Sequence, residues 1–307
     1  MNRTIPFCTA IMLAVGIGVA GQGQLERITV PLSNPGRPVT LDINLYAGAV
    51  TITAVDGPDV VIEASGEPVP VTTKGKGSAR TIVKKVVKKP APGKVGKVPT
   101  TTSPVSRPPA RDTTGLTQLP QPPVLEVDEA DNVVRVRGPV GQRIDMTIQV
   151  PVRTSLRLKK SATGASAGAR PVTVRGLDGD LEISTEAGSI TLTDVAGSVV
   201  AHSTSGSVIA TVRRVTPDRP MAFTSYSGNV DVSLPSSLKA DLLLQSDRGN
   251  VFTNFGVKVG STPSPDEKPG AGFRRTGRQP IRASVNGGGP DFELRTFAGS
   301  VYLRKVE

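Results

Sequence analysis

The sequence predicts an all-β fold of the solenoid type, in which short strands stack as repeated rungs. Four glycines recur at a spacing of nine residues, at Gly179, Gly188, Gly197 and Gly206. Each is followed by apolar residues at the second and fourth positions after it, namely Leu181/Ile183, Ile190/Leu192, Val199/Ala201 and Val208/Ala210. Outside the N-terminal segment no apolar pattern repeats every 3.6 residues, so we expect very little helix.

A second, longer period is superimposed on the nine-residue spacing. The residue two places before each glycine alternates between apolar and polar, as Leu177, Glu186, Val195 and Thr204. The repeat is therefore a rung of eighteen residues in two halves, and stacked rungs bury a continuous aliphatic column that no single rung could bury. An antiparallel sandwich or meander is the alternative, because hairpins also recur every 8–12 residues or so. The alternation favours the solenoid.

Residues 1–23 have the features of an export signal. Arg3 provides the positive start, Ile5 to Val19 the apolar run, and residues 18–22 the small-residue cleavage region. The alternative is a short membrane anchor, but a span needs about 20 apolar residues, more than this run provides. We therefore expect an exported protein of the periplasm, the cell surface or the extracellular space.

The only cysteine, Cys8, lies inside the signal. Cleavage would leave a chain without thiols, which excludes disulfides, thiolate catalysis and cysteine-based metal sites. Aromatic residues make up 3% of the chain and Trp is absent, so the core must come from Val, Ile, Leu and Ala.

Residues 24–65 contain the first predicted strands. Leu41–Leu45, Val50–Ile52 and Val60–Ile62 alternate apolar and polar side chains, a pattern typical of half-buried strands.

Residues 66–123 interrupt this pattern with a Lys-, Pro-, Ser- and Thr-rich insert. It contains eleven basic and two acidic side chains, a net charge of +9 against +11 for the whole chain. It lacks aromatic residues and is too polar to form a core, so we expect it to be disordered. Such a chain attracts polyanions by counterion release. The residues we expect to contact them are Lys74, Lys76, Arg80, Lys84, Lys85, Lys88, Lys89, Lys94 and Lys97.

The expected partners of this basic insert are anionic envelope polysaccharide, lipopolysaccharide or lipid headgroups. The lack of aromatics argues against base stacking, so any nucleic-acid binding would be non-specific. The alternative is a solvated linker with no partner.

Residues 124–307 return to strand patterning, at Val124–Val127, Val133–Val136 and Ile144–Pro151. The glycine-started unit recurs with broken spacing at Gly48, Gly228 and Gly299, and more weakly at Gly249. Residues 258–280 are Pro- and Gly-rich and predict a flexible loop.

These repeats resemble a known family. The segments Val174–Leu181 and Ser203–Val208, and the closing Asn286–Gly289 followed by Arg295–Val301, are similar to the bacterial putative-adhesin family of exported β-strand-repeat domains. The resemblance covers residues 41–65 and 124–307 and excludes the basic insert. It implies a single-stranded, right-handed β-helix-like fold, and it implies no catalytic residues, because the function of these domains is unknown.

Candidate catalytic or metal-binding residues are sparse. The sole histidine, His202, lies between Ala201 and Ser203 and is expected to be exposed on a strand. Calcium binding is an open alternative for Asp178, Asp180 and Asp194, and an enzyme cluster is an alternative for these aspartates together with Arg213 and Arg214. Aspartates beside glycines more often stabilise turns. The Asn286–Gly289 run is expected to be a turn and, less favourably, an anion-binding nest. We expect no cofactor and no metal.

The function that the sequence favours is a non-enzymatic, adhesin-like interaction protein of the cell envelope. Lectin-like recognition of neutral sugars uses aromatic platforms, and only the tyrosines Tyr46, Tyr226 and Tyr302 are available. This scarcity argues against binding of neutral sugars and leaves the binding of polyanions open. One alternative is a structural scaffold that self-assembles through the solenoid ends, since open strand edges invite pairing. A less favoured alternative is a β-helix enzyme acting on polysaccharide.

Overall fold

A computed structural model describes residues 25–68, 125–161, 168–260 and 279–306. Within these ranges the chain forms strands and turns and no helix, so no described helix could cross a membrane. The predicted signal and almost all of the basic insert lie outside the described residues. Most of the predicted 258–280 loop does too, although Lys258 and Val259 belong to a strand and not to a loop.

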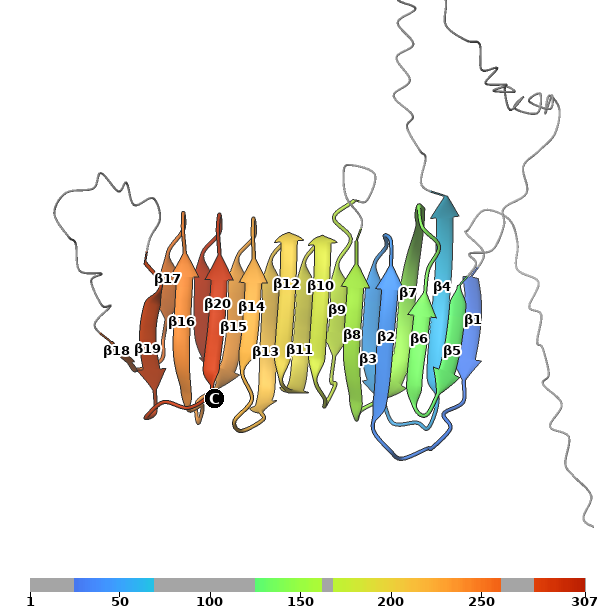
Figure 1. The fold of residues 1–307 in the computed structure, drawn as a ribbon, viewed down its shortest axis with the longest axis horizontal. Coiled ribbons are helices and arrows are strands. Elements are labelled where there is room, and N and C mark those ends of the chain that lie inside the picture. Colours follow the sequence, from blue (N-terminus) through green and yellow to red (C-terminus); the bar gives the residue numbers. More distant parts are fainter. Residues whose placement is uncertain (1–24, 69–124, 162–167, 261–278, 307) are drawn as a thin grey trace, which may run out of the picture. The chain divides into compact units, whose positions relative to one another are not determined.

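The strands form two long sheets (Figure 1). Sheet A has ten strands, in the spatial order β1 (Leu25–Val30), β4 (Val60–Pro68), β7 (Gln142–Pro151), β3 (Val50–Val55), β9 (Val172–Arg175), β11 (Ile190–Gly197), β13 (Val208–Val215), β15 (Val230–Pro235), β21 (Val301–Val306) and β17 (Val251–Thr253).

Sheet B has eleven strands, in the spatial order β18 (Val257–Val259), β19 (Ile281–Val285), β16 (Ala240–Ser246), β20 (Asp291–Thr296), β14 (Met221–Ser225), β12 (Val199–Ser205), β10 (Leu181–Ala187), β8 (Thr154–Lys160), β2 (Val39–Leu45), β6 (Val133–Arg137) and β5 (Glu126–Ala130). Pairing is parallel along most of both sheets. Antiparallel pairs close the ends, where β1, β4 and β7 pair in sheet A and β5/β6 and β16/β19/β18 pair in sheet B.

The eighteen-residue rung is confirmed by the strand register. Leu181 on β10 pairs with Val199 on β12, and Ile190 on β11 pairs with Val208 on β13. In both pairs the two residues are eighteen positions apart, so each strand lies beside the equivalent strand of the next rung. Inward-facing aliphatic side chains of both sheets form one continuous core, in which Ile190, Leu192, Val199 and Val208 are at most 1% exposed. The chain is therefore a β-solenoid, with one strand of each rung in each sheet.

The order of rungs departs from chain order at both ends of the stack. The β2–β3 rung lies between β6–β7 and β8–β9, and the β20–β21 rung lies between β14–β15 and β16–β17. Figure 1 shows this as a blue rung between green ones and a red β20 between orange strands. The sequence did not predict this interleaving.

Turn glycines of successive rungs touch one another. A Cβ atom built on Gly228 would collide with the backbone of Gly206 and Ser207, and one on Gly299 would collide with the backbone of Gly228. Gly206 meets Gly188 in the same way. Glycine is required here because the backbone of the neighbouring rung fills the space that a side chain would need.

A column of buried hydroxyl groups runs beside these glycines. Ser225 Oγ donates to the carbonyl oxygen of Gly206 at 2.7 Å and accepts the N–H of Gly228 at 2.8 Å. Thr296 Oγ1 repeats the pattern in the next rung, with the Gly228 carbonyl at 2.6 Å and the Gly299 N–H at 3.2 Å. Each hydroxyl thus satisfies the turn of its own rung and links it to the rung before, as buried polar groups require.

Substituting Gly228 should test this contact. We expect Gly228→Ala to lower the free energy of unfolding by about 2–4 kcal/mol, because the added methyl group must push two rungs apart. Gly57→Ala is the matched control, since no atom lies within 4 Å of its Cβ position, and it should change stability by less than about 0.5 kcal/mol. Denaturant unfolding of both variants measures the difference, and equal losses would contradict the close-contact interpretation.

Candidate functional site

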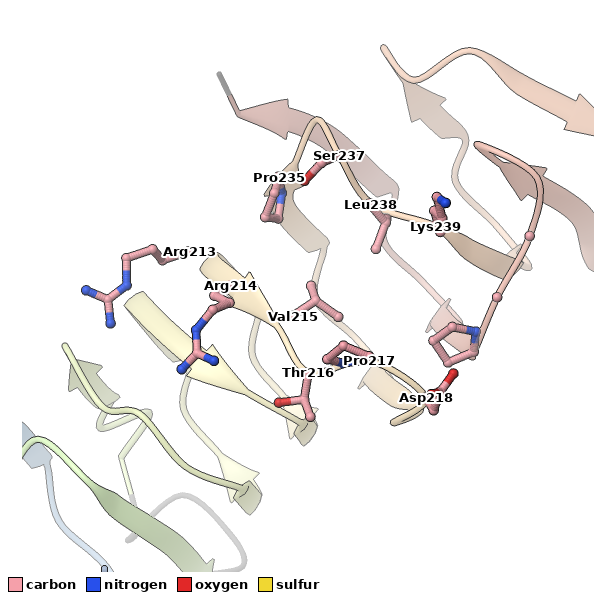
Figure 2. A pocket seen from close by; sticks show the side chains of 13 residues that line it. Arg213, Arg214, Val215, Thr216, Pro217, Asp218, Pro235, Ser237, Leu238 and Lys239 are labelled. Carbon is pink, nitrogen blue, oxygen red and sulfur yellow. The ribbon is translucent and has the colours of Figure 1, made fainter.

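The loops at one edge of the stack enclose a pocket of about 440 Å³, called here the rim pocket. It is formed by the end of β13, the loop before β14, the loop between β15 and β16, and the turn before β20. Figure 2 shows Val215, Pro217 and Leu238 between Arg214 on one side and Lys239 on the other.

The rim pocket combines an apolar floor with cationic side chains, two of which are already paired. Arg214 binds Asp178 through two hydrogen bonds of 2.6 and 2.8 Å, and Arg213 lies 3.6 Å from Asp194. Lys239 is exposed and has no ion-pair partner among the described residues. The pocket therefore places one ammonium group and the carboxylate of Asp218 beside aliphatic and proline side chains, and this lining does not favour an anion.

The sequence contains a signal for this pocket, which lies in the glycine spacing and not in a catalytic motif. From Gly206 to Gly228 the rung lengthens from eighteen residues to twenty-two. The extra residues form the 216–220 loop that builds one wall of the pocket. A break in the glycine spacing thus marks where a loop leaves the stack.

The nine basic residues predicted to bind polyanions all lie outside the described residues, so their role stays a prediction. The three aspartates considered as calcium ligands form ion pairs with arginines. Asp180 pairs with Arg219 at 2.6 Å, and Asp178 and Asp194 pair with Arg214 and Arg213. The described part of the chain contains no group of three His, Cys, Asp or Glu side chains placed to hold a metal ion.

The structure confirms two further expectations. His202 is exposed on β12, as expected. The Asn286–Gly289 run forms the turn between β19 and β20, where the Gly288 N–H donates to the Val285 carbonyl at 3.1 Å. Three successive residues from Asn286 have positive φ, which explains the glycines at this turn.

Lys160 is the buried cation of the described residues, with 2% of its surface exposed. It ends β8 at the position that hydroxyl residues occupy in later rungs, and its Nζ donates to the carbonyl oxygens of Gly48 and Arg170. Burial lowers the pKa of Lys160 to about 8, while the nearby Asp145 carboxylate opposes the shift. Because Lys160 satisfies turn carbonyls as the serines do, we assign it a structural role.

The lowered pKa of Lys160 predicts a pH dependence of stability. Below about pH 8 the amine is charged in both states, and burial of that charge destabilises the fold. Between about pH 8 and 10.5 the unfolded chain binds more protons than the folded chain, so the free energy of unfolding should rise with pH, by up to about 3 kcal/mol.

Urea titrations across this pH range measure the effect. The rise should disappear in Lys160→Met and persist in Lys159→Met, whose side chain is exposed on the same strand. Identical pH profiles for the two variants would show that Lys160 does not cause the dependence.

Comparison with known proteins finds a family model that matches part of this chain. Residues 173–289 match the family model described as toastrack DUF4097, which confirms the resemblance drawn from the repeats. A "putative cell adhesion protein" from Clostridium sporogenes aligns over 93% of this chain and 100% of its own, with 10% identity and a TM-score of 0.41. A "putative adhesin" from Bacteroides fragilis aligns over 92% and 97%, with 10% identity and a TM-score of 0.37. No curated protein matches the chain.

Proposed function

We propose that this chain, which carries a toastrack domain, is a non-enzymatic interaction protein of the cell envelope whose basic insert holds anionic envelope polymers. The observation that carries the proposal is the charge of residues 66–123, where eleven basic side chains face only two acidic ones. Lipopolysaccharide, acidic polysaccharide and anionic lipid headgroups are the polyanions that an exported protein meets.

The contrast with the solenoid supports this choice. Most arginines of the described strands and loops lie in ion pairs with neighbouring carboxylates, including Arg27, Arg135, Arg137, Arg157, Arg170, Arg213, Arg214, Arg219, Arg295 and Arg304. Exposed pairs of this kind contribute little to stability, but they neutralise the local field. The excess positive charge of the chain is therefore concentrated in the insert.

The insert also has a suitable point of attachment. Residues 69–124 connect β4 to β5, strands near the same end of the two sheets. A long insertion is tolerated there at modest entropic cost, because lengthening a loop costs only about 0.6 kcal/mol per doubling. The solenoid can thus keep its packing while the insert makes contacts of its own.

The first test removes the charge of the insert. Full-length protein should bind lipopolysaccharide and polygalacturonate and should lose this binding when residues 70–115 are deleted. A matched variant of unchanged length, with the nine basic residues from Lys74 to Lys97 replaced by Gln, should lose it too. Wild-type affinity should fall at least about tenfold between low and physiological salt, because each phosphate or carboxylate contact releases counterions. Unchanged binding after the deletion would refute the proposal.

A second function, self-assembly through a solenoid end, is favoured by a specific observation. The edge strands β17 and β18 end sheets A and B at the same end of the stack, and both expose apolar side chains. Phe252 is 49% exposed, Val259 is 64% exposed, and the neighbouring Ile281 is 38% exposed. Open edges with apolar side chains are pairing sites for a second chain.

Sedimentation at increasing protein concentration tests this alternative. If the end pairs with another copy, the wild type should form larger species and a Phe252→Ser/Val259→Ser variant should stay monomeric. Val140→Ser is the control, because Val140 is 88% exposed in a turn away from these edges. A wild type that is monomeric at every concentration would exclude the scaffold.

A further inference from the structure

A second cleft, separate from the rim pocket, lies on the outer face of sheet B. Its volume is about 330 Å³, and its lining includes His202, Thr224, Tyr226, Gln245, Arg295 and Phe297. Pockets that hold small ligands have volumes of about 300–1,000 Å³ and combine apolar surface with a few fixed polar groups. The size and lining of this cleft fall within that description.

The cleft is built by strand register across four neighbouring rungs. His202 on β12 pairs with Thr224 on β14, Thr224 with Arg295 on β20, and Arg295 with Gln245 on β16. These outward-facing residues form one row across the sheet, at the strand spacing of about 4.8 Å. The short Thr224 lies between longer neighbours, so the row is hollowed at its centre.

Two aromatic rings form one side of the cleft. Tyr226 and Phe297 follow the ends of β14 and β20, and their rings stack with centroids 4.8 Å apart and planes 5° from parallel. The guanidinium of Arg248 covers Phe297 at 4.8 Å from the ring centroid. The Tyr226 side of the stack faces the rung of β12, where Thr204 stands at the equivalent position, and Tyr226 remains 56% exposed.

The polar groups of the cleft are held in place by one another and by their strands. Gln245 Nε2 donates to Asp247 Oδ1 at 2.9 Å, and Arg295 donates to Glu293 Oε1 at 3.0 Å. The Tyr226 hydroxyl and the His202 ring have no hydrogen-bond partner among the described residues. The cleft thus presents both donors and acceptors beside an aromatic surface.

We infer that this cleft binds one pyranose ring of a neutral oligosaccharide, with the sugar packed on Tyr226 and its hydroxyl groups bonded to His202, Thr224 and Arg295. A pyranose has an apolar C–H face that packs on aromatic rings and a rim of hydroxyls that needs mixed donors and acceptors. A purely aromatic ligand would leave the polar row unsatisfied, and an anion would gain no net attraction, because Asp247 and Glu293 balance the charges of Arg248 and Arg295.

This inference is independent of the polyanion proposal, because it uses a different surface and different chemistry. Stacking and neutral hydrogen bonds are only weakly affected by salt, whereas insert binding should depend on it strongly. Deleting residues 70–115 should therefore leave neutral-sugar binding unchanged. The two ideas can fail separately.

The chain supplies its own matched control. Tyr302 stacks on Phe252 with centroids 5.2 Å apart on the outer face of sheet A, but neither ring lines this cleft. Removing Tyr302 therefore removes a similar cross-strand aromatic pair without altering the proposed site. Comparing Tyr226→Ala with Tyr302→Ala separates a ligand-binding role from a stabilising one.

Isothermal titration with cello-, chito- and manno-hexaose provides the test, using full-length protein. We expect at least one hexaose to bind, Tyr226→Ala to weaken it at least tenfold, His202→Ala to weaken it several-fold, and Tyr302→Ala to leave it unchanged. Tyr226→Phe should bind better than Tyr226→Ala, because the ring remains. The inference is wrong if no hexaose binds the wild type, if Tyr226→Ala binds normally, or if Tyr302→Ala weakens binding equally.

Discussion

The contact between turn glycines of neighbouring rungs is the constraint on which the rest of this structure depends. Where Gly206, Gly228 and Gly299 meet, no Cβ atom fits, and the backbones approach closely enough for a buried hydroxyl to bridge them. This approach sets the rung-to-rung distance at the parallel strand spacing, which in turn brings the aliphatic side chains into one column. A side chain at the turn would separate the rungs and expose that column together with the unpaired hydroxyls.

The same constraint explains why rungs can stack out of chain order. Each rung from β10–β11 to β16–β17 presents a glycine turn, an inward hydroxyl and similar aliphatic positions, so the β20–β21 rung fits between β14–β15 and β16–β17 as well as beyond them. Its insertion links residues nearly seventy positions apart, as in the bond from Thr296 to Gly228. Interleaving at both ends also makes the stack depend on its terminal segments, because removing either one would leave a gap inside the stack and not at its edge.

This uniformity decided what the sequence could predict. The nine-residue glycine spacing and the alternation at Leu177, Glu186, Val195 and Thr204 predicted the rung, its two halves and its buried face. The order of the rungs was not predictable from the sequence, because rungs with similar turns and similar aliphatic positions can pack against more than one neighbour. The burial of Lys160 was not predictable either. In the sequence it is one of two adjacent lysines, and only the register shows that it occupies the position held by Thr185 in the next rung.

The aromatic cleft follows from the interleaving. The small number of tyrosines in the sequence argued against an aromatic platform, and Phe297, the ring that stacks on Tyr226, lies seventy-one residues away in the chain. Insertion of β20 beside β14 brings the two rings into contact and adds Arg295 to the row that begins at His202. With β16 directly beside β14, the equivalent positions would instead hold Gln245 and Asp247, and the row would lack both the second ring and the guanidinium. The insertion of the β20–β21 rung between β14–β15 and β16–β17 therefore also assembles the proposed binding surface.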